Sequence, residues 1–196
     1  MTVRGRAGFT LIEAAIAITL LALVMVKVGM LVKIRSESAD REDVELVTDD
    51  QAHRVLDQIA YAVMGASRER LFPDPESPTH SSELRFELML GLQDGEVVWG
   101  DSQWIGLDAS GTQVSWRERP DEPDERRVVW CSVVRPFLEG EIVNGVDDND
   151  NGLIDETGLV FTLEGDCVTI RLTLERTSAS GQVVTRNVEA KATCRN

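Results

Sequence analysis

The sequence has few of the residues, and none of the short motifs, on which many enzymes and metal sites depend. It contains two histidines and three cysteines, and no CxxC, HExxH or GxSxG motif occurs. Outside the N-terminal region it lacks a basic run, and 34 acidic residues exceed 20 Lys and Arg to give a net charge of −14. A phosphate-binding surface is therefore not expected. We predict that the chain is not an enzyme and does not bind nucleic acid.

The three cysteines are too widely separated to suggest a zinc site. Cys131, Cys167 and Cys194 show neither paired Cys spacing nor a histidine in motif spacing. Disulfides persist outside the cytosol, so a chain exported from the cytosol is expected to form one disulfide and keep one free thiol. The spacing leaves open which two cysteines pair.

A long apolar segment begins near the N-terminus. Between residues 9 and 31 the only ionisable side chains are those of Glu13 and Lys27. At ~1.5 Å per residue, a helix over this segment spans the ~30 Å hydrocarbon core of a bilayer. A cleavable secretory signal would be shorter and would end in small residues, but no Ala-x-Ala break follows this segment. We therefore predict a transmembrane helix over residues 9–34.

Glu13 is an unfavourable residue inside such a helix. A carboxylate within the bilayer costs roughly 2.5–3.5 kcal/mol on insertion scales, so a compensating cation is expected. Cleavage before Phe9 would create an α-amino group one helical turn from Glu13. The amine of a neighbouring subunit would serve equally. Glu13 is thus a candidate assembly residue.

The stretch "RAGFTLIEAAIAITLLAL" resembles the class III signal of type IV prepilins and type II secretion pseudopilins. The resemblance implies that prepilin peptidase removes a leader of residues 1–8. Gly8 would precede the cut, and Phe9 would become the N-methylated terminus. It also implies a single-pass protein of the inner membrane with its C-terminal head in the periplasm. The expected partners are other major and minor pseudopilins or pilins.

The rest of the chain predicts an α+β fold. Apolar residues keep helical spacing from Val44 to Val63, and no proline interrupts the chain before Gly65, so an amphipathic helix is expected over residues 35–65. Residues 67–83 contain three prolines and are predicted to form a loop. Alternating apolar residues predict strands at 83–90, 96–100, 102–108, 112–118, 126–134, 159–163, 167–175 and 182–192.

These strands are expected to form an antiparallel β-sheet head, residues 66–196, on which the long helix packs as in pilins. Tyr61 and Met64 are predicted to pack between helix and sheet. The four tryptophans are predicted to pack in the core of the head rather than to form a ligand platform; they are Trp99, Trp104, Trp116 and Trp130.

The last two predicted strands fix a register. Pairing Val168 with Ala192 puts the apolar residues of both strands on one face and leaves residues 179–181 as a hairpin loop. Arg171 then lies opposite Glu189 on the outer face. This hairpin resembles the C-terminal hairpin of J-type minor pseudopilins and related minor pilins.

The stretch "VNGVDDNDNGLIDETG" has the oxygen-ligand spacing of an EF-hand-type calcium loop. Gly158 stands where a bidentate glutamate would be the twelfth ligand, so Asp155 or Glu156 would have to complete the shell. An acidic turn without metal is the alternative. The predicted Ca²⁺ ligands are Asp147, Asn149, Asn151, Leu153 through its carbonyl, Asp155 and Glu156.

Together these features predict a minor pseudopilin or minor pilin, a structural subunit that assembles through its N-terminal helix. It would join the tip complex of a type II secretion system or a type IV pilus. The alternative is a calcium-dependent adhesin or binding subunit displayed at a pilus tip.

Overall fold

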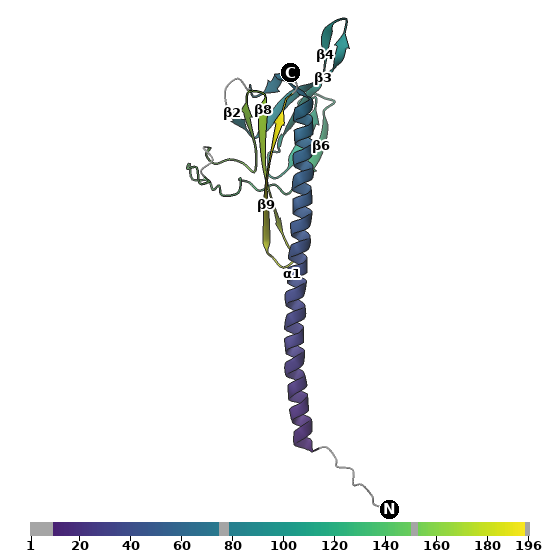
Figure 1. Cartoon of the computed structure of the whole chain (residues 1–196), viewed down its shortest axis with the longest axis vertical. Helices are drawn as coiled ribbons and strands as arrows, with labels where there is room; N and C mark the ends of the chain where they lie inside the picture. Colours follow the sequence, from purple (N-terminus) through teal and green to yellow (C-terminus); the bar gives the residue numbers. More distant parts are fainter. Residues whose placement is uncertain (1–9, 75–78, 150–152, 195–196) are drawn as a thin grey trace, which may run out of the picture.

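The computed structural model describes residues 10–74, 79–149 and 153–194. In this part of the chain, one long helix, α1 (Leu11–Gly65), runs along the molecule, and a β-sheet head packs against its C-terminal half (Figure 1). The N-terminal half of α1 projects from the head, and every residue from 10 to 36 is exposed. The predicted α+β, pilin-like architecture is confirmed.

Local interactions explain where α1 begins and ends. Thr10 is the N-cap residue: its Oγ1 accepts a hydrogen bond from the Glu13 N–H at 3.4 Å, and Glu13 Oε2 accepts one from the Thr10 N–H at 2.9 Å. This reciprocal pair is a capping box. At the other end, Ala66 adopts extended backbone and begins a strand. The predicted helix end near Gly65 is therefore confirmed.

The head covers one side of the C-terminal half of α1. The buried helix residues recur every three or four positions and are Thr48, Ala52, Val55, Leu56, Ile59 and Val63. They pack mainly on β8 (Cys167–Thr177) and β9 (Val183–Thr193). Leu46 and Val47, two apolar residues of the same segment, are 70% and 53% exposed because they lie on the uncovered side.

The head contains two antiparallel sheets, whereas the sequence suggested one. The five-stranded sheet has the order β1–β3–β4–β5–β6, and the four-stranded sheet has the order β2–β7–β8–β9. The remaining strands are β1 (Ala66–Phe72), β2 (Thr79–Ser81), β3 (Glu83–Gln93), β4 (Glu96–Leu107), β5 (Val114–Glu118), β6 (Arg126–Cys131) and β7 (Leu159–Glu164).

The loop predicted after α1 is wrong, because β1 and β2 lie there. The β1 strand buries Leu71 and carries two arginines that find distant partners. Arg68 pairs with Asp166 at 3.2 Å, and Arg70 pairs with Glu87 at 3.6 Å. The loop was predicted from the three prolines of this segment, and these long-range ion pairs leave no local pattern in the sequence.

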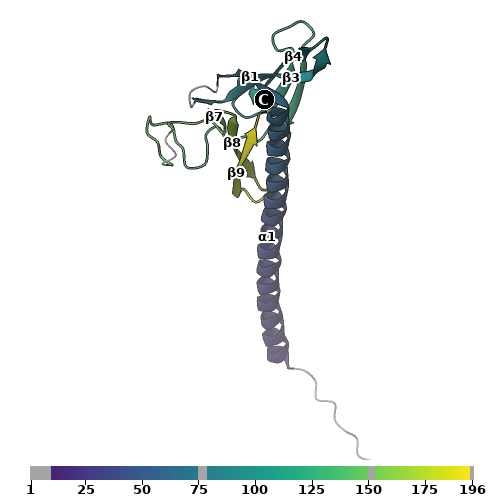
Figure 2. The same ribbon diagram turned by 45° about the horizontal axis from the view of Figure 1, so that its top comes forward.

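The two strands predicted at 96–100 and 102–108 form one strand, β4. With β3 it makes a hairpin that projects beyond the C-terminal end of α1 (Figure 2). Its turn contains Asp94 and Gly95, both with positive φ, which matches a tight hairpin. The strand predicted at 126–134 stops at Cys131, and Val134 instead bridges to Leu174 of β8.

The predicted register of β8 and β9 is confirmed. Val168 pairs with Ala192, and Arg171 pairs with Glu189, whose Oε2 accepts a hydrogen bond from Arg171 Nε at 2.8 Å. The hairpin loop lies at residues 179–181, where Gly181 has φ of 84°. Local alternation and turn chemistry were therefore sufficient to place this hairpin.

The disulfide expected from the sequence is absent, because all three cysteines are free thiols. Cys167 is half-buried beside Thr193, while Cys194 is buried. Cys131 is buried in the other sheet, on β6. Burial raises the pKa of the Cys131 thiol, and burial, with Asp166 and Cys167 nearby, raises the pKa of Cys194.

Candidate functional site

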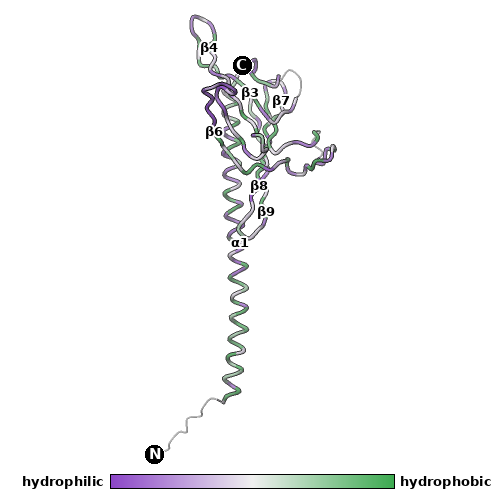
Figure 3. Tube along the Cα trace, turned by 180° about the vertical axis from the view of Figure 1, so that it is seen from behind, coloured by the Kyte–Doolittle hydropathy of each residue, from purple (hydrophilic) through white to green (hydrophobic). Residues whose placement is uncertain are grey.

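The exposed N-terminal half of α1 is the first candidate site. Its colouring by hydropathy is mostly green along the part that projects from the head (Figure 3). By length and composition it could cross a membrane, and none of its most apolar window is buried in the molecule. A helix that is apolar on all sides needs lipid or other helices around it.

Glu13 lies in the first turn of this segment. Its Oε2 accepts hydrogen bonds from the Thr10 N–H and the Thr10 hydroxyl, both at 2.9 Å. The free N–H groups of a helix N-terminus also favour a negative charge there. The carboxylate is nevertheless exposed, so it remains accessible to a cation from another chain. Gly8 and Phe9, the predicted processing residues, lie outside the described residues.

The acidic loop between β6 and β7 is the second candidate site. Its most deeply buried carboxylate belongs to Glu141, which is 1% exposed and which the sequence did not single out. Glu141 accepts a hydrogen bond from the Asn149 N–H at 3.1 Å and another from the Asp155 N–H at 3.2 Å. The Glu141 side chain thus connects the first part of the acidic loop, at Asn149, to its last part, at Asp155. No local pattern distinguishes Glu141 from a surface glutamate, which explains why it was missed.

Asp155 and Glu156 have different surroundings. Asp155 Oδ1 accepts hydrogen bonds from the N–H groups of Asn144 and Gly145, at 3.0 and 3.2 Å. Its carboxylate therefore already holds the start of the loop. Glu156 is 4% exposed, and neither of its carboxylate oxygens has a hydrogen-bond partner. An isolated buried carboxylate is costly unless a cation or proton compensates it.

The structure explains why residue 158 is glycine. A Cβ added to Gly158 would lie 1.9 Å from the carbonyl oxygen of Arg135. The Gly158 N–H donates to the Pro136 carbonyl at 3.2 Å, and the Gly158 carbonyl accepts from the Thr173 N–H at 2.8 Å. Residue 158, the twelfth position of the calcium-loop pattern, thus provides no side-chain ligand. Its backbone instead connects the start of β7 to Pro136 and Thr173.

The predicted calcium ligands are partly described. Asn151 lies outside the described residues, whereas Asp147, Asn149, Leu153, Asp155 and Glu156 lie within them. In the part of the chain that the structure describes, no group of three or more His, Cys, Asp or Glu side chains is close enough to hold a metal ion. Calcium also binds amide and backbone carbonyl oxygens, which are not among these side chains. The calcium site therefore stays a prediction.

Comparison with known proteins gives one match. Residues 3–26 match the family model described as the prokaryotic N-terminal methylation motif. The match covers the apolar start of α1 and the residues before it, including the Gly8–Phe9 junction and Glu13. No curated protein and no solved structure matches the chain.

Proposed function

We propose, from its N-terminal methylation motif and its fold, that the chain is a type IV pilin- or pseudopilin-type protein with a membrane-anchoring helix, and that it is a minor subunit of a type II secretion or type IV pilus machine. The observation that carries this proposal is the fully exposed apolar half of α1, joined without a break to the helix of the head. The helix anchors the subunit in the inner membrane, and the head lies in the periplasm.

Assembly follows from the chemistry of Glu13. In the bilayer, its charge is unfavourable until a cation approaches. The Phe9 amine of an adjacent subunit supplies that cation when the apolar helices bundle, so the pair sets the register between subunits. The minor role is supported by the resemblance of the β8–β9 hairpin to that of J-type minor pseudopilins. A binding subunit at a pilus tip is the alternative, and it rests on the acidic loop.

Processing tests the family role directly. Intact mass spectrometry of the protein from its native host is expected to show a chain that starts at Phe9 and carries one added methyl group. Gly8→Glu should retain the leader because Gly8 precedes the scissile bond. Gly5→Glu, three residues earlier, should still be cut. A wild-type chain that begins at Met1 would overturn the proposal.

We further propose that the acidic loop binds one Ca²⁺ ion. The residues present fit a hard cation in part: Glu156 is a buried carboxylate with both oxygens unpaired, while Asp147 and Asn149 add oxygen donors nearby in the sequence. Asp155 contributes less than predicted because it already accepts two backbone hydrogen bonds. When bound, the ion would neutralise Glu156 and cross-link the loop.

Calcium is expected to stabilise the head. Binding to the folded state alone contributes ~2.7 kcal/mol at a hundredfold excess over Kd. In full-length protein in detergent, the tryptophan fluorescence melting temperature should be higher in millimolar calcium than in chelator. Magnesium should substitute poorly, because it requires a smaller octahedral shell.

Three variants separate binding from general charge effects. Asp147→Ala should abolish the calcium-dependent rise in melting temperature. Glu156→Gln should reduce that rise and increase the melting temperature in chelator, because it removes an unpaired buried charge. Glu96→Ala, an exposed acid on the β3–β4 hairpin, should leave the rise unchanged. Equal melting temperatures of the wild type in calcium and chelator would identify the loop as an acidic turn.

A further inference from the structure

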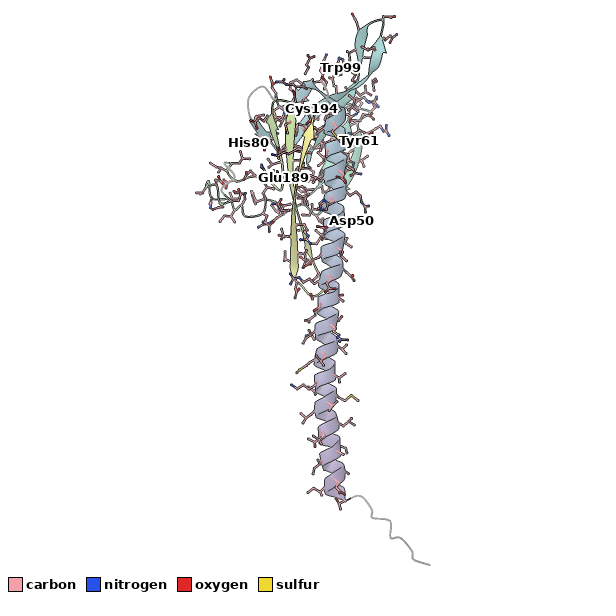
Figure 4. The ribbon with its side chains drawn as sticks, viewed as in Figure 1. Asp50, Tyr61, His80, Trp99, Glu189 and Cys194 are labelled. Carbon is pink, nitrogen blue, oxygen red and sulfur yellow. The ribbon has the colours of Figure 1, made fainter. Side chains whose placement is uncertain are left out.

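An open groove lies between the last turns of α1 and one face of the five-stranded sheet. Its volume is about 1020 Å³. The helix side includes Asp57 and Tyr61, and the sheet side includes Met89, Trp116 and Trp130. Figure 4 marks Tyr61 on α1 beside the head. The groove runs alongside the helix that anchors the protein in the membrane.

The groove combines exposed side chains on α1 with tryptophans of the sheet, because Trp116 and Trp130 are half-buried and pack against the core. Tyr61 is the only tyrosine in the sequence, yet it is 79% exposed, and Met64 is 50% exposed. The prediction that both pack between helix and sheet is therefore wrong. Trp116 is held in place because its indole N–H donates to Gln103 Oε1 at 2.9 Å. Exposed Tyr and Met side chains beside half-buried tryptophans are typical of protein interfaces.

The helix side of the groove has an excess of negative charge. Arg54 forms an ion pair with Asp50 one turn earlier. Among the described residues, Asp57 has no ion pair and no hydrogen bond to its carboxylate, although it lines the groove. A partner that enters the groove would be favoured by a basic side chain opposite Asp57.

We propose that this groove receives an amphipathic helix from a neighbouring pilin-type subunit. The incoming helix inserts apolar side chains between Tyr61 and the two tryptophans, and places a Lys or Arg against Asp57. This is the helix-in-groove mode of recognition. The inference rests on the proposed function, because subunits anchored in one membrane by similar helices lie alongside α1.

The charge pattern favours a different subunit over a second copy of this chain. The exposed side of α1 carries Asp43, Asp50 and Asp57, and its Arg54 is already paired with Asp50. A second copy that docked through this side would bring carboxylates toward Asp57, which is repulsive. The partner helix must therefore have a more basic exposed face than α1.

Site-specific photocrosslinking in native host membranes tests this docking. The full-length chain would carry p-benzoylphenylalanine in place of Tyr61, an exposed position that tolerates the change. The expected adduct joins residue 61 to a peptide from the N-terminal helix of another protein with the same methylation motif, identified by mass spectrometry. Val183, 59% exposed at the start of β9, provides a position on the head outside the groove and should give little of this adduct.

Charge reversal tests the contact with Asp57. Asp57→Lys should lower the yield of the Tyr61 adduct about tenfold or more, whereas Asp43→Lys should change it less than twofold. Both side chains are exposed, and they lie 14 residues apart on a similar side of α1, but only Asp57 lines the groove. A yield that does not respond to Asp57→Lys would overturn the predicted contact.

A crosslinker at Leu23, in the membrane half of α1, separates this inference from the proposed function. Suppose that the crosslinker at position 23 labels another pilin-type subunit, but the one at position 61 labels nothing, or a head strand, or a second copy of this chain. The groove inference is then wrong and the proposed function stands. If neither position labels a pilin-type subunit, both are wrong. Labelling from both positions, with the Asp57 dependence, supports both.

Discussion

Replacing Gly158 with alanine is expected to lower the free energy of unfolding of the head by about 3 kcal/mol. The added Cβ would overlap the Arg135 carbonyl, which is fixed backbone rather than a flexible side chain. Relieving the overlap would displace the segment that bridges Val134 to Leu174 and Phe137 to Thr157. The first bridge attaches the segment after β6 to β8, and the second joins the two segments that flank the acidic loop.

The measurement is denaturant unfolding of the full-length chain in detergent, followed by tryptophan fluorescence. All four tryptophans lie in the head, so the signal reports its unfolding. Gly181→Ala is the matched control, because Gly181 has φ of 84° but open space around the site of a new Cβ. It should cost about 1 kcal/mol. Equal losses for the two variants would show that the contact with Arg135 is not the reason for glycine at residue 158.

Gly158 also illustrates why part of the acidic loop could not be predicted. The spacing of oxygen-bearing residues is local, so the sequence was enough to propose a calcium loop and to notice the missing twelfth ligand. The reason for the glycine depends on Arg135, 23 residues earlier in the chain. The anchoring role of Glu141 likewise depends on contacts with Asn149 and Asp155 that no pattern in the sequence encodes.

The same distinction applies to the fold. The end of α1 and the register of β8 and β9 follow from periodicity and turn residues, and both were predicted. The β1 strand was missed because the three prolines in residues 67–83 indicated a loop, whereas its pairing with β3 and the ion pairs of Arg68 and Arg70 form only in the folded head. The direction of Tyr61 was mispredicted because it depends on which side of α1 the head leaves uncovered.

Replacing Glu13 with glutamine is expected to separate membrane insertion from assembly. Removing the charge lowers the cost of transfer into the bilayer, so insertion should be unchanged or better. Glutamine can still accept the hydrogen bonds of the capping box with Thr10, so the helix start should persist. The variant lacks only the negative charge that attracts the amine of an adjacent subunit.

We expect Glu13→Gln to be processed and membrane-bound but to co-purify with sister subunits at least tenfold less than the wild type, a loss of about 1.4 kcal/mol or more. Thr10→Ala is the matched control, because it removes the cap and keeps the charge. It should weaken the first turn by about 1 kcal/mol and leave assembly close to the wild type. The opposite pattern, with assembly lost in Thr10→Ala and kept in Glu13→Gln, would mean that Glu13 acts by capping α1. Since the charge alone is unfavourable in lipid, only a charge-dependent loss explains why a carboxylate is present in this apolar helix.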